Sequence, residues 1–108
     1  MNISKIYIAS DHAGYEAKMQ VKSILENMGV LVIDLGTDNA KNSVDYPDFA
    51  LALIHQMQSH ENARGILVCT TGIGMSMMAN RFDFIRGALV QNTDMAKMCR
   101  AHNDANVL

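Results

Sequence analysis

Gly65-Ile66-Leu67-Val68-Cys69-Thr70-Thr71-Gly72-Ile73-Gly74 is the stretch that decides the fold. Residues 65–68 are apolar apart from the leading glycine and predict a buried β-strand, and the two later glycines predict a turn. Residues 75–80, which follow, are typical of a short helix. A strand that runs through a glycine-rich turn into a helix opens a βαβ unit, so this stretch predicts an α/β protein.

The rest of the chain continues this alternation of short apolar runs and amphipathic stretches. Apolar residues at helical spacing predict helices over residues 15–28, 47–59 and 92 or 93 to 100. Pro47 fits the first position of its helix, because proline lacks the N–H that would be unpaired there. Short apolar runs predict further strands at residues 6–9, 30–33 and 88–90, and the beginning of another at 106–108.

This pattern predicts an α/β fold with a parallel sheet of about five strands, covered on both faces by helices. Ligands of such folds bind beyond the carboxyl ends of the strands. Asp11 and His12 follow the first strand, and the turn 69–74 follows the third. His102 and Asn103 fall just before the fifth strand and complete the set of candidate site residues.

Size and composition narrow the class of protein. The chain has 108 residues and a formal net charge of −2, without a block of like charge, so we expect one domain and neither nucleic acid nor a membrane as partner. We expect a cytoplasmic protein, because no secretory signal and no apolar run of ~18 residues occurs. Two cysteines without zinc-type spacing predict free thiols and no metal. Nine methionines predict a soft core.

The Cys69 turn carries the strongest chemical signal. Backbone N–H groups at the start of a helix can hold a phosphate or a developing oxyanion, and they can stabilise the thiolate of a cysteine at the head of the turn. The alternative is equally open from the local sequence: Cys69 could be a small buried hydrophobe, and the glycines could simply form the turn.

The other candidates are weaker when each is taken alone. Asp11 could orient a sugar hydroxyl and His12 could bind phosphate, but Asp11 could equally cap a helix beside an exposed histidine. His102 could carry a proton, but a histidine at the C-terminal end of a helix also complements its dipole. Tyr46 could line a site, although helix capping explains its surroundings as well.

Taken together, these segments resemble one family. The matching motifs are Ser10-Asp11-His12-Ala13-Gly14, Asp34-Leu35-Gly36-Thr37, Asp45-Tyr46-Pro47, Gly72-Ile73-Gly74-Met75-Ser76, Ala79-Asn80 and the segment from His102 to Leu108. Their order and spacing resemble the type B ribose-5-phosphate isomerases, whose family also includes subunits of galactose-6-phosphate and allose-6-phosphate isomerases.

The resemblance implies a Rossmann-like three-layer sandwich formed by a single isomerase domain over residues 1–108. It also implies a sugar-phosphate substrate, neither metal nor organic cofactor, and a homodimer or dimer-based tetramer whose active sites are shared between subunits. The reaction implied is the interconversion of D-ribose 5-phosphate and D-ribulose 5-phosphate through an enediolate, in the non-oxidative pentose phosphate pathway.

The resemblance assigns roles by position. Cys69 matches the base that moves a proton between C2 and C1, Thr71 a residue that positions substrate oxygens, and His102 the acid that opens the furanose ring. The implied substrate-binding residues are Asp11 and Asn103 on hydroxyl groups, His12 near the phosphate, Tyr46 in the pocket wall, and Thr70, Gly72, Ile73 and Gly74 in the turn.

Two departures from the family pattern keep alternatives open. Thr70 stands where the family has glycine, which would cost strain if that position needed a positive φ. Family members also continue through a further helix with basic residues, so we expect this chain to lack that segment. The alternatives are an isomerase of a six-carbon sugar phosphate and an inactive, truncated sugar-phosphate-binding module.

Overall fold

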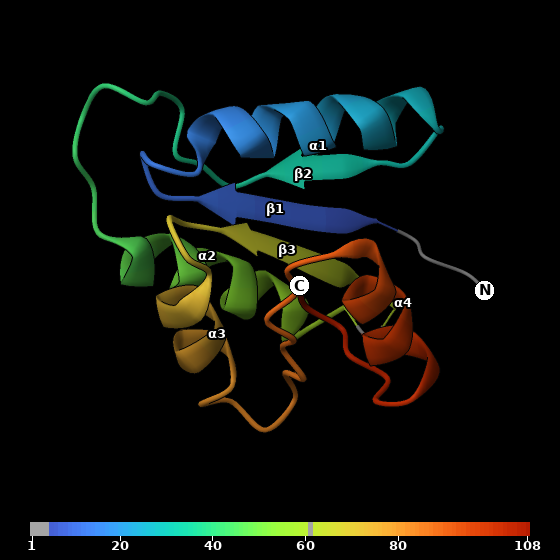
Figure 1. The fold of residues 1–108 in the computed structure, drawn as a ribbon. Helices are drawn as coiled ribbons and strands as arrows, with labels where there is room; N and C mark the ends of the chain where they lie inside the picture. Colours follow the sequence, from blue (N-terminus) through green and yellow to red (C-terminus); the bar gives the residue numbers. More distant parts are fainter. Residues whose placement is uncertain (1–4, 61) are drawn as a thin grey trace.

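The computed structural model describes residues 5–60 and 62–108 (Figure 1). Strands and helices alternate along the chain in the order β1 (Ile6–Ser10), α1 (Tyr15–Asn27), β2 (Val32–Asp34), α2 (Tyr46–Met57), β3 (Arg64–Val68), α3 (Ile73–Ala79) and α4 (Thr93–Ala101). Within the described ranges, no helix combines the length and the apolar character needed to cross a membrane.

The three strands form a parallel sheet in the order β2-β1-β3. The chain moves outward from β1 to β2 and then crosses back over β1 to reach β3. Right-handed crossovers in opposite directions place α1 and α2 on opposite faces of the sheet, and Figure 1 shows α1 on one side and α2 with α3 on the other. The predicted parallel α/β architecture is therefore confirmed, with its topological switch point between β1 and β3.

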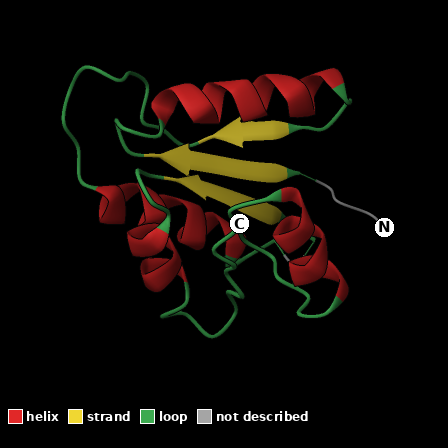
Figure 2. Cartoon of the chain, viewed as in Figure 1, coloured by secondary structure: helices red, strands yellow, loops and turns green. Residues whose placement is uncertain are grey.

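The predicted number of about five strands is wrong for the described residues, which hold a sheet of three (Figure 2). The segments predicted as the fourth and fifth strands contribute only isolated parallel bridges, Gly65 with Val107 and Gly87 with Val107. Leu108 N–H donates to the Gly65 carbonyl at 2.9 Å and Ala88 N–H to the Val107 carbonyl at 2.9 Å. These pairings extend the sheet in the expected direction but are too few to form ladders.

The core lies mainly between the sheet and α2. Leu53 and Ile54 are fully buried there, and a side chain at Gly65 would collide with Leu53 and Met57. Glycine in β3 therefore lets α2 approach the sheet closely. The expectation of a methionine-rich core is wrong: only Met57 and Met75 are buried among the described methionines, and five are exposed, namely Met19, Met28, Met77, Met95 and Met98.

Candidate active site

The turns after β1 and β3 lie against each other at the switch point. Asp11 N–H donates to the Val68 carbonyl at 3.3 Å, and an added side chain at Gly14 would lie 2.6 Å from that same oxygen. Asp11 is buried, and its Oδ1 accepts the Gly14 N–H at 2.9 Å. One Asp11 oxygen therefore holds the turn before α1, but the N-cap of α1 is Gly14 and no side chain caps this helix, so the predicted capping by Asp11 is wrong. That bond does not use the second carboxylate oxygen.

Cys69 is half-buried at the head of its turn. Gly72 adopts a φ of 80°, a left-handed conformation that favours glycine, and its N–H donates to Cys69 Sγ at 3.1 Å. Sulfur accepts such a hydrogen bond more strongly as a thiolate than as a thiol. The turn thus aims a backbone donor at the sulfur.

Thr71 makes the second side-chain contact within the turn. Its Oγ1 accepts the Ile73 N–H at 3.2 Å, while Ser76 N–H donates to the Gly72 carbonyl at 3.0 Å. Two of the turn's amides, those of Gly72 and Ile73, are therefore engaged by side chains of the turn itself. The Thr71 hydroxyl accepts in its bond, so its own proton remains available for another acceptor.

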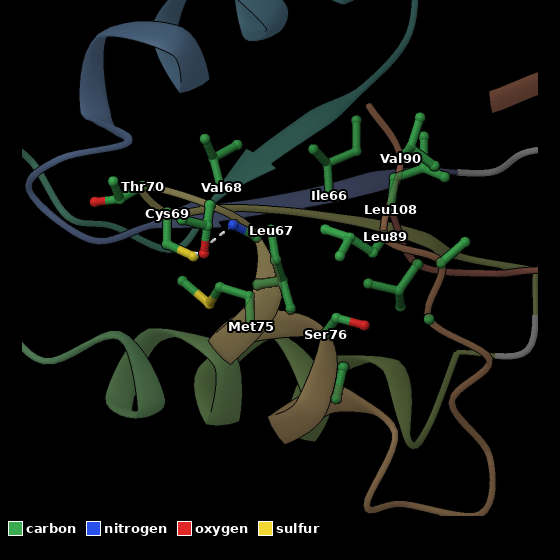
Figure 3. A pocket seen from close by; sticks show the side chains of 16 residues that line it. Ile66, Leu67, Val68, Cys69, Thr70, Met75, Ser76, Leu89, Val90 and Leu108 are labelled. Carbon is green, nitrogen blue, oxygen red and sulfur yellow. Dashed lines mark hydrogen bonds between the residues drawn. The ribbon is translucent and has the colours of Figure 1, made fainter. Parts of the chain in front are cut away.

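A cavity of about 330 Å³ adjoins the Cys69 turn on the side of α3 and residues 87–90. Figure 3 shows Cys69 and Thr70 at one end of the cavity and Leu89, Val90 and Leu108 at the other. Its lining is mostly aliphatic and excludes Asp11, His12 and Tyr46. Thr70 and Thr71 line the cavity, whereas Asp11 and Tyr46 approach the turn outside it, Asp11 after β1 and Tyr46 from α2.

His12 is half-buried and connects the turn after β1 to the long loop after β2. Its Nδ1 accepts the Val44 N–H at 3.1 Å. Since Nδ1 is the acceptor, the neutral ring carries its proton on Nε2 and presents an N–H donor there.

Tyr46 begins α2, directly before Pro47. A side chain at Gly74 would lie 2.5 Å from the Tyr46 ring, so the ring packs directly on the backbone of the Cys69 turn. Tyr46 is 39% exposed. The structure thus brings Tyr46 to the turn, on a side from which it could border a ligand.

Thr70 is exposed, and its backbone does not need glycine. Over residues 5–60 and 62–108, Asp104 is the only non-glycine residue with a positive φ. The strain that the sequence suggested at Thr70 is therefore absent, and the side chain simply occupies space beside Cys69.

His102 and Asn103 lie at the opposite end of the sheet from Cys69. Gly65 N–H donates to the Asn106 carbonyl at 2.9 Å, so the residues before Asn106 lie beyond the amino end of β3. Cys69 follows the carboxyl end of that strand, about 13 Å further along the sheet. Figure 1 shows α4, which ends next to His102, away from the Cys69 turn. One copy of the chain therefore does not bring His102 to Cys69.

Lys18 and Asp34 form a buried ion pair that the sequence did not single out. Lys18 is fully buried in α1, and its Nζ lies 2.7 Å from Asp34 Oδ1 and also donates to the Thr37 carbonyl. Burial opposes ionisation of Asp34, but bonds from Lys18 and the Gly36 N–H and the charges of Lys18 and Lys22 outweigh it, so the pKa of Asp34 is lowered.

This ion pair fastens the end of β2 to α1. The loop that begins at Thr37 leads to Val44 and so to His12. The available signal was a lysine within the apolar stripe of a predicted helix, together with an aspartate at the end of a strand. Among the residues that the structure describes, no group of three or more His, Cys, Asp or Glu side chains is placed to hold a metal ion.

Fold and site together define a class: a Rossmann-like α/β protein whose candidate small-ligand site lies at the switch point, beside Cys69. The family model for ribose/galactose isomerase matches residues 6–108. The chain therefore belongs to the ribose/galactose isomerase family, as the sequence motifs indicated.

Individual relatives agree in sequence and in structure. A probable ribose-5-phosphate isomerase B from Mycoplasma pneumoniae is 48% identical over 103 residues, which are 95% of this chain and 68% of that protein. The crystal structure of a ribose 5-phosphate isomerase from Thermotoga maritima matches with a TM-score of 0.93 and 48% identity, over 99% of this chain and 73% of that one. The crystal structure of a ribose-5-phosphate isomerase B from Mycoplasma genitalium with bound ribulose-5-phosphate matches with a TM-score of 0.91 and 37% identity. The match covers 96% of this chain and 69% of that one.

Proposed function

We propose that this protein is an aldose–ketose isomerase that interconverts D-ribose 5-phosphate and D-ribulose 5-phosphate. The observation that carries the proposal is Cys69 at the switch point of a ribose/galactose isomerase fold, with the Gly72 N–H directed at its sulfur. The relative that was solved with ribulose-5-phosphate supports the choice of a five-carbon substrate.

Cys69 acts in this proposal as the base. Its thiolate takes the C2 proton of the open-chain aldose, and the electron pair moves toward the C1 carbonyl to give an enediolate. The thiol then returns its proton to C1, while the proton of the C2 hydroxyl passes to the C1 oxygen and the C2 carbonyl forms. Neither a redox partner nor a metal is needed for this balance.

The surrounding turns supply orientation and charge stabilisation. The Thr71 hydroxyl can donate to a substrate oxygen while its Oγ1 accepts the Ile73 N–H. The second oxygen of Asp11 can accept from a sugar hydroxyl. His12, held by Val44 through Nδ1, can donate its Nε2 proton to the phosphate. The amides of Thr71 and Gly74 are the other donors of this loop for the enediolate, since those of Gly72 and Ile73 are engaged.

His102 and Asn103 enter the proposed site from a second copy of the chain. They lie at the amino end of the strands, whereas Cys69 lies at the carboxyl end, so a shared site in a homodimer or dimer-based tetramer would unite them. In that arrangement His102 is the acid that opens the furanose ring, and Asn103 binds a hydroxyl. We place the enzyme in the cytoplasm and in the pentose phosphate pathway.

A six-carbon sugar phosphate is the second candidate substrate, because the family that matches the chain includes galactose as well as ribose isomerases. Thr70 fills space beside Cys69 and favours the smaller substrate.

A binding module without turnover is the third candidate. Proton NMR of the protein with ribose 5-phosphate, galactose 6-phosphate and allose 6-phosphate in parallel separates the three. The proposal is supported if ribose 5-phosphate is converted faster than the two six-carbon phosphates. It is contradicted if the protein binds these compounds without converting any of them.

A further inference from the structure

Two arginines hold the turn from His102 to Ala105, which is exposed as far as Asp104 and buried at Ala105. Arg86 donates from Nε and Nη2 to the Asn103 carbonyl, at 3.0 and 2.7 Å. Arg100 Nη1 donates to Asp104 Oδ1 at 3.0 Å and also to the Ala105 carbonyl. Asp104 has a φ of 51°, which an aspartate keeps only when its surroundings hold it there.

Arg86 is itself fixed at its backbone. Its N–H donates to Asn106 Oδ1 at 2.8 Å, and the Asn106 N–H returns a bond to the Arg86 carbonyl at 3.0 Å. Asn106 Nδ2 also donates to the Phe84 carbonyl at 2.9 Å. The guanidinium therefore reaches the turn from a rigid base, and two donors that converge on one carbonyl oxygen restrict the rotation of that peptide.

Stability alone accounts poorly for this arrangement. The contacts of Arg86 with Asn103 are exposed to solvent, where charged interactions contribute little to the free energy of folding. What the contacts do fix is the orientation of the peptide between Asn103 and Asp104, which closes the His102–Asn103 turn. A general acid must lie within hydrogen-bond reach of the atom it protonates, and small displacements cost catalysis heavily.

We propose that Arg86 is a positioning residue, which holds the His102–Asn103 turn so that His102 protonates the ring oxygen of the closed sugar. This inference rests on the function proposed above. Arg86 acts through the turn and does not touch the reacting carbons. Its loss should therefore slow the ring-opening step and spare the transfer of the proton between C1 and C2.

Two measurements separate those steps. Turnover of ribose 5-phosphate requires the ring to open. Exchange of the C1 proton of ribulose 5-phosphate with solvent deuterium does not, because this ketose stays open-chain when its 5-hydroxyl carries the phosphate. In the exchange, Cys69 takes the C1 proton, the thiol exchanges with D₂O, and a deuteron returns to C1.

We expect Arg86→Gln to lower turnover of ribose 5-phosphate about tenfold, the value of one or two charge-assisted hydrogen bonds, and to change C1 exchange by less than about twofold. Arg86→Lys, which keeps the charge and one donor, should recover part of the turnover. Arg81→Gln is the matched control: Arg81 is exposed and lies outside the contacts of the turn, so both rates should stay at the wild-type level. Thermal melting and light scattering establish that each variant is folded and assembled. If Arg86→Gln fails to fold or assemble, the turnover and exchange rates of Arg86→Lys are compared with those of wild type instead.

Equal loss of turnover and exchange in a folded Arg86 variant would overturn the inference, as would unchanged turnover. Failure of the proposed function gives a different result. In that case Cys69→Ala would keep C1 exchange, or His102→Ala would keep ribose 5-phosphate turnover, and the role of Arg86 would fall with it. If those two variants lose their respective steps while Arg86→Gln behaves as wild type, only the inference about Arg86 is wrong.

Discussion

The Cys69 turn and the His102 turn are held by different kinds of contact. The first is held by backbone N–H groups that donate to the turn's own short side chains, at Cys69 and Thr71, and by the packing of Gly14 against the end of β3. The second is held chiefly by two long side chains, the exposed Arg86 and the half-buried Arg100. The Cys69 turn therefore shares the rigidity of the central sheet, whereas the geometry of the His102 turn can be changed without unfolding the protein.

The largest effect is expected from Cys69→Ala, which removes the proposed base. Isomerisation and C1 exchange should fall at least about 100-fold, because general-base catalysis supplies that much or more. Cys99→Ala is the matched control, since Cys99 is a buried thiol in α4 whose Sγ donates to the Ala96 carbonyl. Solvent-exchange NMR checks both variants. Retained exchange in Cys69→Ala would contradict the role of the sulfur.

Gly14→Ala tests the backbone packing that supports the Cys69 turn. The new Cβ would lie 2.6 Å from the Val68 carbonyl oxygen, and this backbone atom cannot move away easily because Val68 is paired with Ser10 of β1. We expect the free energy of unfolding to fall by about 2 kcal/mol, as for other overpacked sites. Urea denaturation measures this. Gly87→Ala, whose Cβ would approach the Asn80 side chain at 3.3 Å, should cost clearly less; equal costs would refute the packing argument.

The Lys18–Asp34 pair should make stability depend on pH. The pKa of Asp34 is lower in the folded state than its ordinary value of 3.8. The ion pair's contribution to the free energy of unfolding is therefore complete above about pH 3.8. It is lost as pH falls through the folded pKa, where the carboxylate must be protonated. Urea denaturation from about pH 6 down to about pH 3 should show a smaller loss of stability for Asp34→Asn than for wild type. Asp83→Asn, at an exposed site, should keep the wild-type dependence; identical profiles for all three proteins would contradict the ion pair's role.

The smallest effect is expected from Thr70→Gly. Because Thr70 does not adopt a positive φ, glycine relieves no strain and only adds freedom to the unfolded chain. The free energy of unfolding should fall by less than about 1 kcal/mol. Thr71→Gly is the comparison: it removes the hydroxyl that accepts the Ile73 N–H, and it should lower turnover in addition. A rise in stability for Thr70→Gly would show that the backbone at this position is strained after all.

The sequence predicted most helices and the central strands because their apolar periodicity is undisturbed. β2 begins at Val32 and not at residue 30, because the Val30 N–H still donates to the Leu25 carbonyl of α1 at 3.1 Å. A run of β-branched residues predicts a strand, but the sequence does not show whether a neighbouring strand pairs with each of its residues. The segments at 88–90 and 106–108 fail for the same reason: their composition is right, but their pairing is limited to single bridges.

The site was predictable as a set of turns but not as a geometry. Motif and position brought Asp11, His12, Tyr46 and the Cys69 turn together, as the structure does. Lys18 escaped notice because buried lysines are rare and because its partner Asp34 lies on another element. The sequence places His102 before a predicted strand, whereas Asp11, His12 and Cys69 each follow one. It precedes residues 106–108, and in a parallel sheet that puts it opposite the turns that follow β1 and β3.

The comparison of the two turns is tested most directly by mixing subunits. Cys69→Ala and His102→Ala chains, each inactive alone, should be unfolded together, refolded as a mixture and assayed with ribose 5-phosphate. If each site takes Cys69 from one copy and His102 from another, mixed dimers regain one intact site, and the mixture should reach about a quarter of wild-type turnover. A mixture that is folded and assembled but stays inactive would contradict a site shared between opposite ends of two copies.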